Sequence, residues 1–259
     1  NKVDMKYLNR DEAVKFAFRL LSKKGRERYG HYLVEGMHTV SESVVSGARV
    51  VCILHSENRY VDLTSNISKG GIQVFSYPEK LLRPLSDAIT PQLIFALIKR
   101  DEPVYSGMLT QPEARILILE SLQDPGNTGT IIRTAEALGY DAVFYNKGTV
   151  DIYNTKVLRS MQGSHFHIPV IKSDVINLIS LLKKNRFRIY GSSPGQGSVS
   201  YRSVSPEKKF AVIVGNEAKG IDPAVLAICD RNLFIDMRGN TESLNVSIAA
   251  AILMAHLYP

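Results

Sequence analysis

Along residues 1–104, some segments have apolar residues at the spacing of a helix and others at the alternating spacing of a strand. This predicts a domain of mixed helices and strands. Helical spacing runs from Arg10 to about Ser22, and Asn9 stands before it as an N-cap. The buried face of this helix is expected to carry Val14, Ala17, Phe18 and Leu21. Further elements are predicted as a helix over 37–45 and strands over 32–34, 50–54, 72–75 and 93–98. Glu35, in the turn after the first of these strands, is interpreted as structural rather than catalytic.

A polar segment near residue 105 is expected to divide the chain. Residues 105–112 contain glycine and proline without a sustained period, which is typical of a linker. Over residues 113–259 apolar strands alternate with helical segments, the order of a parallel sheet with crossover helices. Strands are predicted over 115–119, 142–145, 167–171, 188–191, 210–214 and 232–235, and helices over 128–138, 154–161, 175–184, 223–227 and 242–256.

The first of three candidate loops, residues 122–130, leads from a strand into a helix. Asn127 is expected to cap that helix, and Gly126 and Gly129 to let the backbone turn tightly. Helical periodicity places Arg133 opposite the buried stripe, where it is either solvated or functional. The patterns G-x-G-x-x-G and G-x-x-x-x-G-K-[ST] are absent, which argues against a dinucleotide oxidoreductase and a Walker-type NTPase.

The second loop, residues 212–220, lies at the end of a predicted parallel strand, where ligands bind in such sheets. Gly215 and Gly220 allow close approach to the backbone. Glu217 either accepts hydrogen bonds from a substrate or an arginine, or is a solvated carboxylate in a plain turn.

The third loop, residues 234–247, enters a final helix that is apolar nearly all round. Such a helix must be covered on several sides, so a second subunit is expected against it. Polar groups crowd its entrance, and capping by Thr241 or Ser243 explains only part of this cluster. The cluster consists of Ser243, Asn245 and Ser247.

The net charge of the chain indicates the kind of partner that it binds. The 259 residues carry a net charge of +7, and residues 2–28 hold nine Lys or Arg against four Asp or Glu. This favours a polyanionic partner, with residues 2–28 either an RNA-docking arm or a solvated basic helix. The cluster from Lys183 to Arg188 is interpreted as a helix end.

Other residue types exclude several classes of protein. Two cysteines rule out a disulfide-rich scaffold and a cysteine-rich zinc module. No apolar run reaches membrane-spanning length, so a cytoplasmic protein is expected. His165 and His167 alternate along a predicted strand without further ligands, so no metal is expected there.

Three segments in order, residues 124–139, 215–220 and 242–247, resemble the three motifs of the SPOUT methyltransferases. The similarity covers about residues 113–259 and is strongest to the SpoU/TrmH branch of RNA ribose 2′-O-methyltransferases. Residues 29–36 and 86–92 are similar to the ribosomal-protein-like substrate-binding domain of the branch members that act on guanosine in 23S rRNA. The resemblance implies an α/β fold with a C-terminal trefoil knot, a homodimer, S-adenosylmethionine as methyl donor and RNA as partner, with rRNA favoured over tRNA.

The resemblance also implies a site, whose catalysis requires in-line positioning of a ribose hydroxyl and removal of its proton. Arg133 is then either the general base or a clamp for developing alkoxide charge, oriented by Glu217. We favour the clamp, because an arginine guanidinium is effectively always protonated in proteins and cannot readily accept a proton. The rival hypothesis is a non-catalytic RNA-binding or ribosome-assembly factor. Asp236 departs from the family pattern, in which many relatives have proline. The implied catalytic set is Arg133, Asn127, Glu217, Ser243 and Asn245, and the implied cofactor contacts are Gly215, Ile235, Leu244, Val214, Asn216, Met237 and Ser192.

Overall fold

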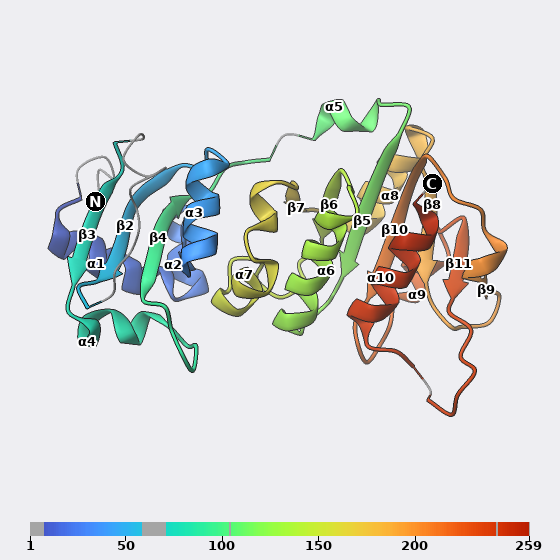
Figure 1. The fold of residues 1–259 in the computed structure, drawn as a ribbon. Helices are drawn as coiled ribbons and strands as arrows, with labels where there is room; N and C mark the ends of the chain where they lie inside the picture. The colour runs from blue at the N-terminus through green and yellow to red at the C-terminus, as the bar shows by residue number, and fades with distance from the viewer. Residues whose placement is uncertain (1–7, 59–70, 104, 242, 259) are drawn as a thin grey trace. The chain divides into compact units, whose positions relative to one another are not determined.

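The computed structural model describes residues 8–58, 71–103, 105–241 and 243–258. The chain forms two compact units, residues 1–102 with 153–166, and residues 103–152 with 167–259 (Figure 1). Residues 153–166 therefore pack with the first unit, although strands of the second unit precede and follow them in the sequence.

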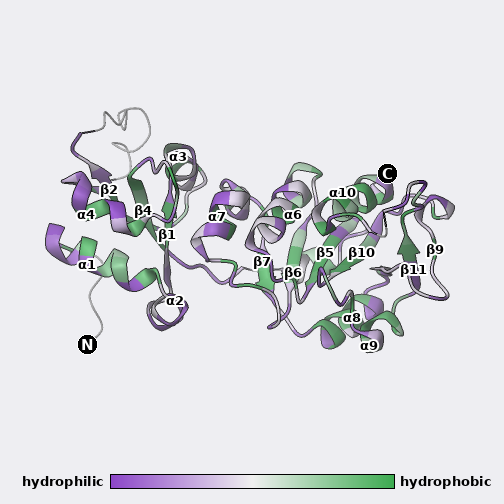
Figure 2. Cartoon of the chain, turned by 90° about the horizontal axis from the view of Figure 1, so that it is seen from below, coloured by the Kyte–Doolittle hydropathy of each residue, from purple (hydrophilic) through white to green (hydrophobic). Residues whose placement is uncertain are grey.

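The first unit is built on a four-stranded mixed sheet in the order β1-β4-β2-β3. Strand β4 is antiparallel to β1 and β2, and β3 is parallel to β2. Figures 1 and 2 show α1 and α2 on one face of this sheet and α3 on the other. Its elements are α1 (Arg10–Leu20), α2 (Lys23–Tyr29), β1 (His31–Glu35), α3 (Met37–Val45), β2 (Val50–Ser56), β3 (Gln73–Tyr77), α4 (Glu79–Leu82), a 3₁₀ turn (Arg83–Leu85), β4 (Ile94–Lys99) and α7 (Thr155–Met161).

Helix α1 begins as predicted but its buried face was predicted only in part. Asn9 accepts from the Glu12 N–H at 2.9 Å and Glu12 accepts from the Asn9 N–H at 3.1 Å, which makes a capping box. Phe18 is 37% exposed, because the helix turns a neighbouring stripe towards the sheet. That buried stripe consists of Ala13, Val14, Phe16, Ala17 and Leu20.

The basic segment is not a separate arm over the part that the structure describes. Helix α1 contributes to the core of the first unit, and α2 follows it directly, which the apolar pattern did not predict. Arg26 of α2 is buried and donates to the carbonyls of Leu20 and Leu21, both at 2.8 Å. It therefore fixes the turn between the helices. Lys2 and Lys6 lie outside the described residues.

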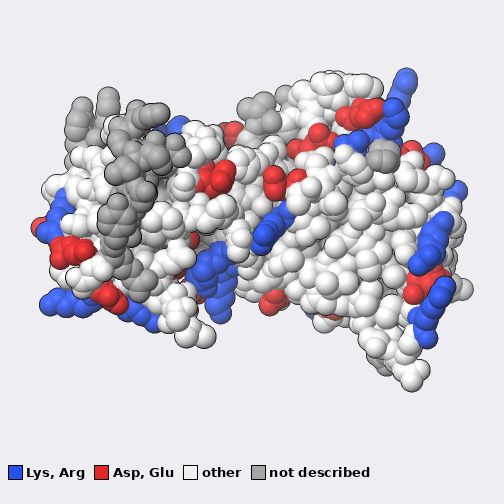
Figure 3. Space-filling model, viewed as in Figure 1, with Lys and Arg blue, Asp and Glu red and all other residues white. Residues whose placement is uncertain are grey.

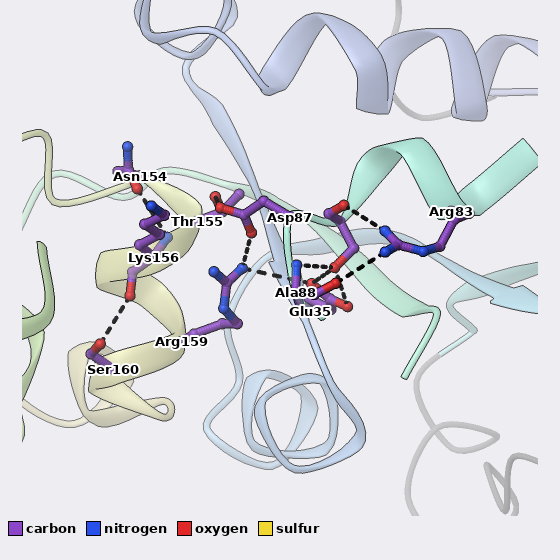
Figure 4. Close-up of polar contacts among 10 residues, drawn as sticks. Glu35, Arg83, Asp87, Ala88, Asn154, Thr155, Lys156, Arg159 and Ser160 are labelled. Carbon is purple, nitrogen blue, oxygen red and sulfur yellow. Dashed lines mark hydrogen bonds and ion pairs between the residues drawn. The ribbon is translucent and has the colours of Figure 1, made fainter. Parts of the chain in front are cut away.

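Glu35 has structural partners, as the sequence interpretation favoured (Figure 4). Its carboxylate oxygens accept from the Ser86 hydroxyl at 2.8 and 2.6 Å. Arg159 of α7 lies 3.9 Å from Glu35 and pairs with Asp87. These contacts attach α7 to the β1 edge of the first unit.

The second unit is a seven-stranded parallel sheet in the order β7-β6-β5-β10-β8-β11-β9. Helices α6 and α10 cover one face, and α8 and α9 cover the other (Figures 1 and 2). Its elements are α5 (Ser106–Leu109), β5 (Ala114–Glu120), α6 (Pro125–Ala137), β6 (Ala142–Tyr145), β7 (Val170–Lys172), α8 (Val175–Lys184), β8 (Arg188–Ser192), β9 (Val199–Ser200), β10 (Lys209–Gly215), α9 (Pro223–Leu226), β11 (Arg231–Phe234) and α10 (Val246–Leu257).

Three segments after residue 104 differ from the structure predicted for them. Residues 164–166 form a 3₁₀ turn and β7 starts only at Val170, so His165 and His167 do not alternate along a strand. Helix α7 ends at Met161 with Gln162 (φ 48°) as its left-handed C-cap, and Gly163 (φ 93°) leads into this turn. The short helix α5 lies inside the predicted linker, and the short strand β9 lies in a segment for which no strand was predicted.

Candidate active site

Parallel pairing of β5 with β10 brings the first two candidate loops to one edge of the sheet. Glu120 pairs with Gly215 at the ends of these strands, so residues 121–124 and 216–220 leave the sheet side by side. A Cβ atom on Gly215 would lie 2.5 Å from the Gly220 carbonyl carbon, so only glycine fits under the returning loop. Asn216 and Gly220 close this loop with backbone hydrogen bonds of 3.0 and 2.9 Å.

The start of α6 corrects the predicted cap. Asp124, not Asn127, is the N-cap, and its side chain accepts from the Asn127 N–H at 2.7 Å. Gly126 and Gly129 lie inside the helix rather than in a turn. Because Asp124 satisfies the free N–H, the Asn127 carboxamide is available for other partners.

Asn127 joins the second and third loops. Its Nδ2 donates to Glu217 Oε1 at 3.4 Å, and its Oδ1 accepts from Asn245 Nδ2 at 3.0 Å. Residues from all three motifs therefore form one hydrogen-bonded chain at the carboxyl edge of the sheet.

Glu217 is held as a carboxylate. It accepts from the backbone N–H groups of Gln123 at 3.2 Å and Asp124 at 3.1 Å. Burial acts to raise the pKa of Glu217, but hydrogen bonds from backbone groups and from Asn127 outweigh it, so the pKa lies below its ordinary value. Glu217 thus ties the start of α6 to the loop after β10.

Asn245 is the N-cap of α10, which corrects the predicted capping by Thr241 or Ser243. Its Oδ1 accepts from the Ser247 N–H at 2.8 Å and from the Ser247 hydroxyl. The helix therefore begins at Val246 rather than at Glu242, which lies outside the described residues. Ser243 is exposed ahead of the helix, with no hydrogen bond to another described residue.

Arg133 lies on the exposed side of α6, as helical periodicity predicted. Among the described residues it has no ion pair or hydrogen-bonded side-chain partner, and Glu217 does not orient it. The structure thus brings Asn127, Glu217 and Asn245 together, and leaves Arg133 and Ser243 outside their hydrogen-bonded chain.

The residues expected around a cofactor lie at the ends of neighbouring strands. Strand β8 lies between β10 and β11, and Ser192, Gly215 and Ile235 stand at or just after their carboxyl ends. Ile235 and Leu244 are half-buried, and Met237 is 38% exposed. The backbone of Ser192, Gly215 and Ile235 thus comes to one edge of the sheet, the arrangement that recognition of a cofactor through main-chain groups requires. Val214 and Asn216 flank Gly215 in this edge.

Asp236 has a partner that the sequence did not indicate. Its carboxylate accepts from the hydroxyl of Ser200, next to the point where Ser200 pairs with Phe234. This contact fastens β9 to the loop after β11. In the sequence, only the charge of Asp236 at this position hinted at a contact. Its partner lies 36 positions away, and only the pairing of β9 with β11 brings the two residues together.

Membrane-spanning helices and metal-ligand clusters are both absent from the described residues. None of their helices combines the length and apolarity needed to cross a membrane. None of their His, Cys, Asp and Glu side chains gather in threes as a metal site would require.

The three motifs that resemble those of the SPOUT methyltransferases thus meet at one edge of a parallel α/β sheet. Residues 114–255 match the SpoU rRNA Methylase family, and residues 11–96 match the MRM3-like substrate binding domain. The chain therefore belongs to the SpoU rRNA methylase family, which confirms the resemblance in its motifs.

Individual relatives cover both units. The 23S rRNA (guanosine(2553)-2′-O)-methyltransferase RlmP of Bacillus subtilis (strain 168) is 38% identical over 250 residues, 96% of each chain. A solved RNA 2′-O ribose methyltransferase is 26% identical with a TM-score of 0.82 and covers 95% of this chain and 94% of its own. An AdoMet-bound rRNA methyltransferase from Sinorhizobium meliloti, 24% identical over 95% of this chain and 93% of its own, shares the fold with a TM-score of 0.84.

Proposed function

We propose that this protein transfers a methyl group from S-adenosylmethionine to the ribose 2′-hydroxyl of a guanosine in 23S rRNA. The observation that carries the proposal is the hydrogen-bonded chain of Glu217, Asn127 and Asn245, which unites three family motifs at one sheet edge. Similarity to RlmP over both units supports 23S rRNA and guanosine rather than tRNA. This substrate agrees with the expected cytoplasmic location.

We propose that the two domains predicted from the sequence have separate roles. Residues 1–104 recognise RNA, 105–112 connect, and 113–259 carry methyl transfer, which the positions of the two family matches support. The trefoil knot that the family resemblance implies is part of this proposal, and the family match over residues 114–255 supports it. S-adenosylmethionine would bind at Gly215, Ile235 and Leu244.

In the mechanism, bound S-adenosylmethionine supplies an already activated methyl group. Arg133 acts as a clamp that donates to the ribose hydroxyl or its neighbouring phosphate and stabilises the developing alkoxide. Asn127 and Asn245 orient the reacting groups through the chain anchored on Glu217. The hydroxyl proton leaves to water or phosphate.

We also propose that the enzyme is a homodimer through its second unit. Figure 2 shows α10 as hydrophobic along its length, and its buried side chains Ala250, Leu253, Met254 and Leu257 already meet the core of this unit. Ile248, on the same helix, is 53% exposed. A second copy would cover this remaining apolar face.

Two measurements test the proposed function. Calorimetry with S-adenosylmethionine should detect binding, and its absence at millimolar cofactor would favour a non-catalytic RNA-binding or assembly factor. Mass-spectrometric mapping of 2′-O-methyl marks in rRNA and tRNA, with and without the protein, should show one lost mark in 23S rRNA. A mark lost in tRNA alone would overturn the substrate assignment.

A further inference from the structure

A basic cleft lies at the opposite end of the second unit from the candidate active site. Its volume is about 640 Å³, and it lies where β8 and β10 begin and α8 ends. Figure 3 shows Lys and Arg side chains, with Asp and Glu side chains beside them, at the upper right edge of the second unit, the end at which β5 and β10 start in Figure 1. Strand β10 spans the unit with seven residues, so the cleft is about 20 Å from the Gly215 end. Five basic side chains line it, Lys183, Arg186, Arg188, Lys208 and Lys209.

Most of these cations already have partners. Lys183 lies 3.2 Å from Asp230, and Lys208 lies 2.7 Å from Glu113. Lys209 donates to two backbone carbonyls and lies over the Phe187 ring. Arg188 is 3.8 Å from Glu207. Among the described residues, Arg186 alone of the five has neither an ion pair nor a side-chain hydrogen bond.

Arg186 also has an unusual backbone. Its φ of 65° is in the left-handed region, directly after the end of α8. The N–H groups of Arg186 and Phe187 bond back to Lys183 and Leu182, at 3.0 and 3.1 Å, which is the Schellman arrangement. Glycine is the usual residue at this position because it has no Cβ penalty. An arginine in this left-handed position lines a basic cleft, and its guanidinium has no partner among the described residues, which points to a ligand for that side chain.

We propose that this cleft binds the phosphate backbone of the RNA substrate and that Arg186 contacts a phosphate directly. The inference rests on the proposed function, because it assumes an RNA substrate. The lining carries five cations against two carboxylates, Glu207 and Asp230, so it suits a polyanion. Phe187 is buried, and Lys209 covers its ring, so no aromatic face is offered for base stacking. The cleft therefore positions RNA without reading its sequence.

Substitutions of Arg186 separate the effect of its backbone strain on stability from the effect of its side chain on RNA binding. Arg186→Gly removes the charge and the strain together, so its melting temperature should rise while its affinity for a folded 23S rRNA fragment falls about three- to tenfold. The slope of log affinity against log salt should flatten by about one. Arg186→Asn, which tolerates the left-handed region, should lose RNA affinity equally. Lys184→Gln is the matched control, because Lys184 is exposed on the same helix end but does not line the cleft, and it should change affinity less than twofold.

The outcomes are distinguishable. If wild-type protein methylates the RNA and Arg186→Gly binds it with unchanged affinity and slope, the cleft proposal fails and the proposed function stands. If wild-type protein binds neither RNA nor S-adenosylmethionine, both fail. A change in oligomeric mass with unchanged RNA affinity would assign the cleft to protein contacts and overturn the RNA site. If inorganic phosphate binds to the cleft but the Arg186 variants keep their RNA affinity, the proposed RNA site is also rejected.

Discussion

The carboxamide of Asn245 donates to the carboxamide oxygen of Asn127 at 3.0 Å, across 118 positions of sequence. This bond joins the N-cap of α10 to the first turn of α6. It exists because Asp124 caps α6 and leaves the side chain of Asn127 available. Through Asn127 the connection reaches Glu217 and the loop after β10. Asn127 thus links the third motif to the other two by side-chain hydrogen bonds.

Replacing that asparagine should abolish most activity without unfolding the protein. In Asn127→Ala the bonds to Glu217 and Asn245 are removed, while the backbone cap by Asp124 remains. We expect methyl transfer to fall at least tenfold and stability to fall by about 1 kcal/mol, the usual contribution of a hydrogen bond. Rates on rRNA and thermal melting measure the two effects.

The chain offers a matched control for this substitution. Asp174 caps α8 by accepting from the Asn177 N–H at 2.9 Å, the same Asp-x-x-Asn arrangement, on a helix that covers the opposite face of the sheet from α6 (Figure 2). Asn177→Ala should leave methyl transfer unchanged. Equal losses of activity in both variants would show that the effect of Asn127 is structural.

Glu217 should make stability depend on pH in the acid range. Its pKa in the folded protein lies below the ordinary value of 4.5. A lowered folded pKa means that the carboxylate stabilises the fold fully above the unfolded pKa, and that this contribution is lost as the pH falls through the folded pKa. The melting temperature of Glu217→Gln should therefore lie furthest below that of wild type near neutral pH, and the gap should close below about pH 4. A gap that stays constant from pH 7 to pH 3 would contradict this account.

The sequence predicted the positions of helices and strands better than it predicted which side chains contact one another. Periodicity located α3, α8 and β6 at their observed bounds, because each carries a regular apolar pattern between clear end signals. It missed α2, whose stability comes from buried Arg26 bonding to the preceding turn rather than from an apolar stripe. At the site, the structure joins by hydrogen bonds Asn127, Glu217 and Asn245, three of the five residues that the motifs implied as a catalytic set. The choice of Asp124 over Asn127 as cap is decided by local geometry, since both residue types cap helices well.

An exposed position on α10 tests the proposed dimer. Ile248 is 53% exposed, so Ile248→Glu should not disturb the core of the monomer. We expect the variant to run as a monomer in light scattering after size exclusion and to lose methyl transfer if the site needs both copies. Ile176→Glu, at a 48% exposed position on α8 across the sheet, is the control and should stay dimeric. A dimeric Ile248→Glu protein would place the interface elsewhere.

The basic N-terminal helices should contribute to RNA affinity through their exposed side chains. Deleting residues 1–28 cannot test this, because α1 supplies Phe16 and Leu20 to the core of the first unit. Neutralising exposed cations on α1 and α2 instead should weaken RNA binding and flatten its salt dependence, by up to about 0.7–0.9 for each phosphate that a cation no longer neutralises. Binding of S-adenosylmethionine should be unchanged. Unchanged RNA affinity would mean that these helices are merely solvated. The residues to change to Gln are Lys15, Arg19, Lys23 and Lys24.

Arg133 decides between a clamp and a base. Its side chain is exposed on α6 and unpaired among the described residues, so it is available to a substrate. Arg133→Lys keeps the charge but loses the planar fork of donors, and we expect it to lose most methyl transfer while calorimetry shows normal cofactor binding. Near-wild-type turnover of this variant would reject the clamp. The pH profile of wild type is the second measurement, since a clamp remains protonated and should give a nearly flat rate between pH 7 and pH 9. A steep fall in rate from pH 9 to pH 7 would instead indicate a titrating base.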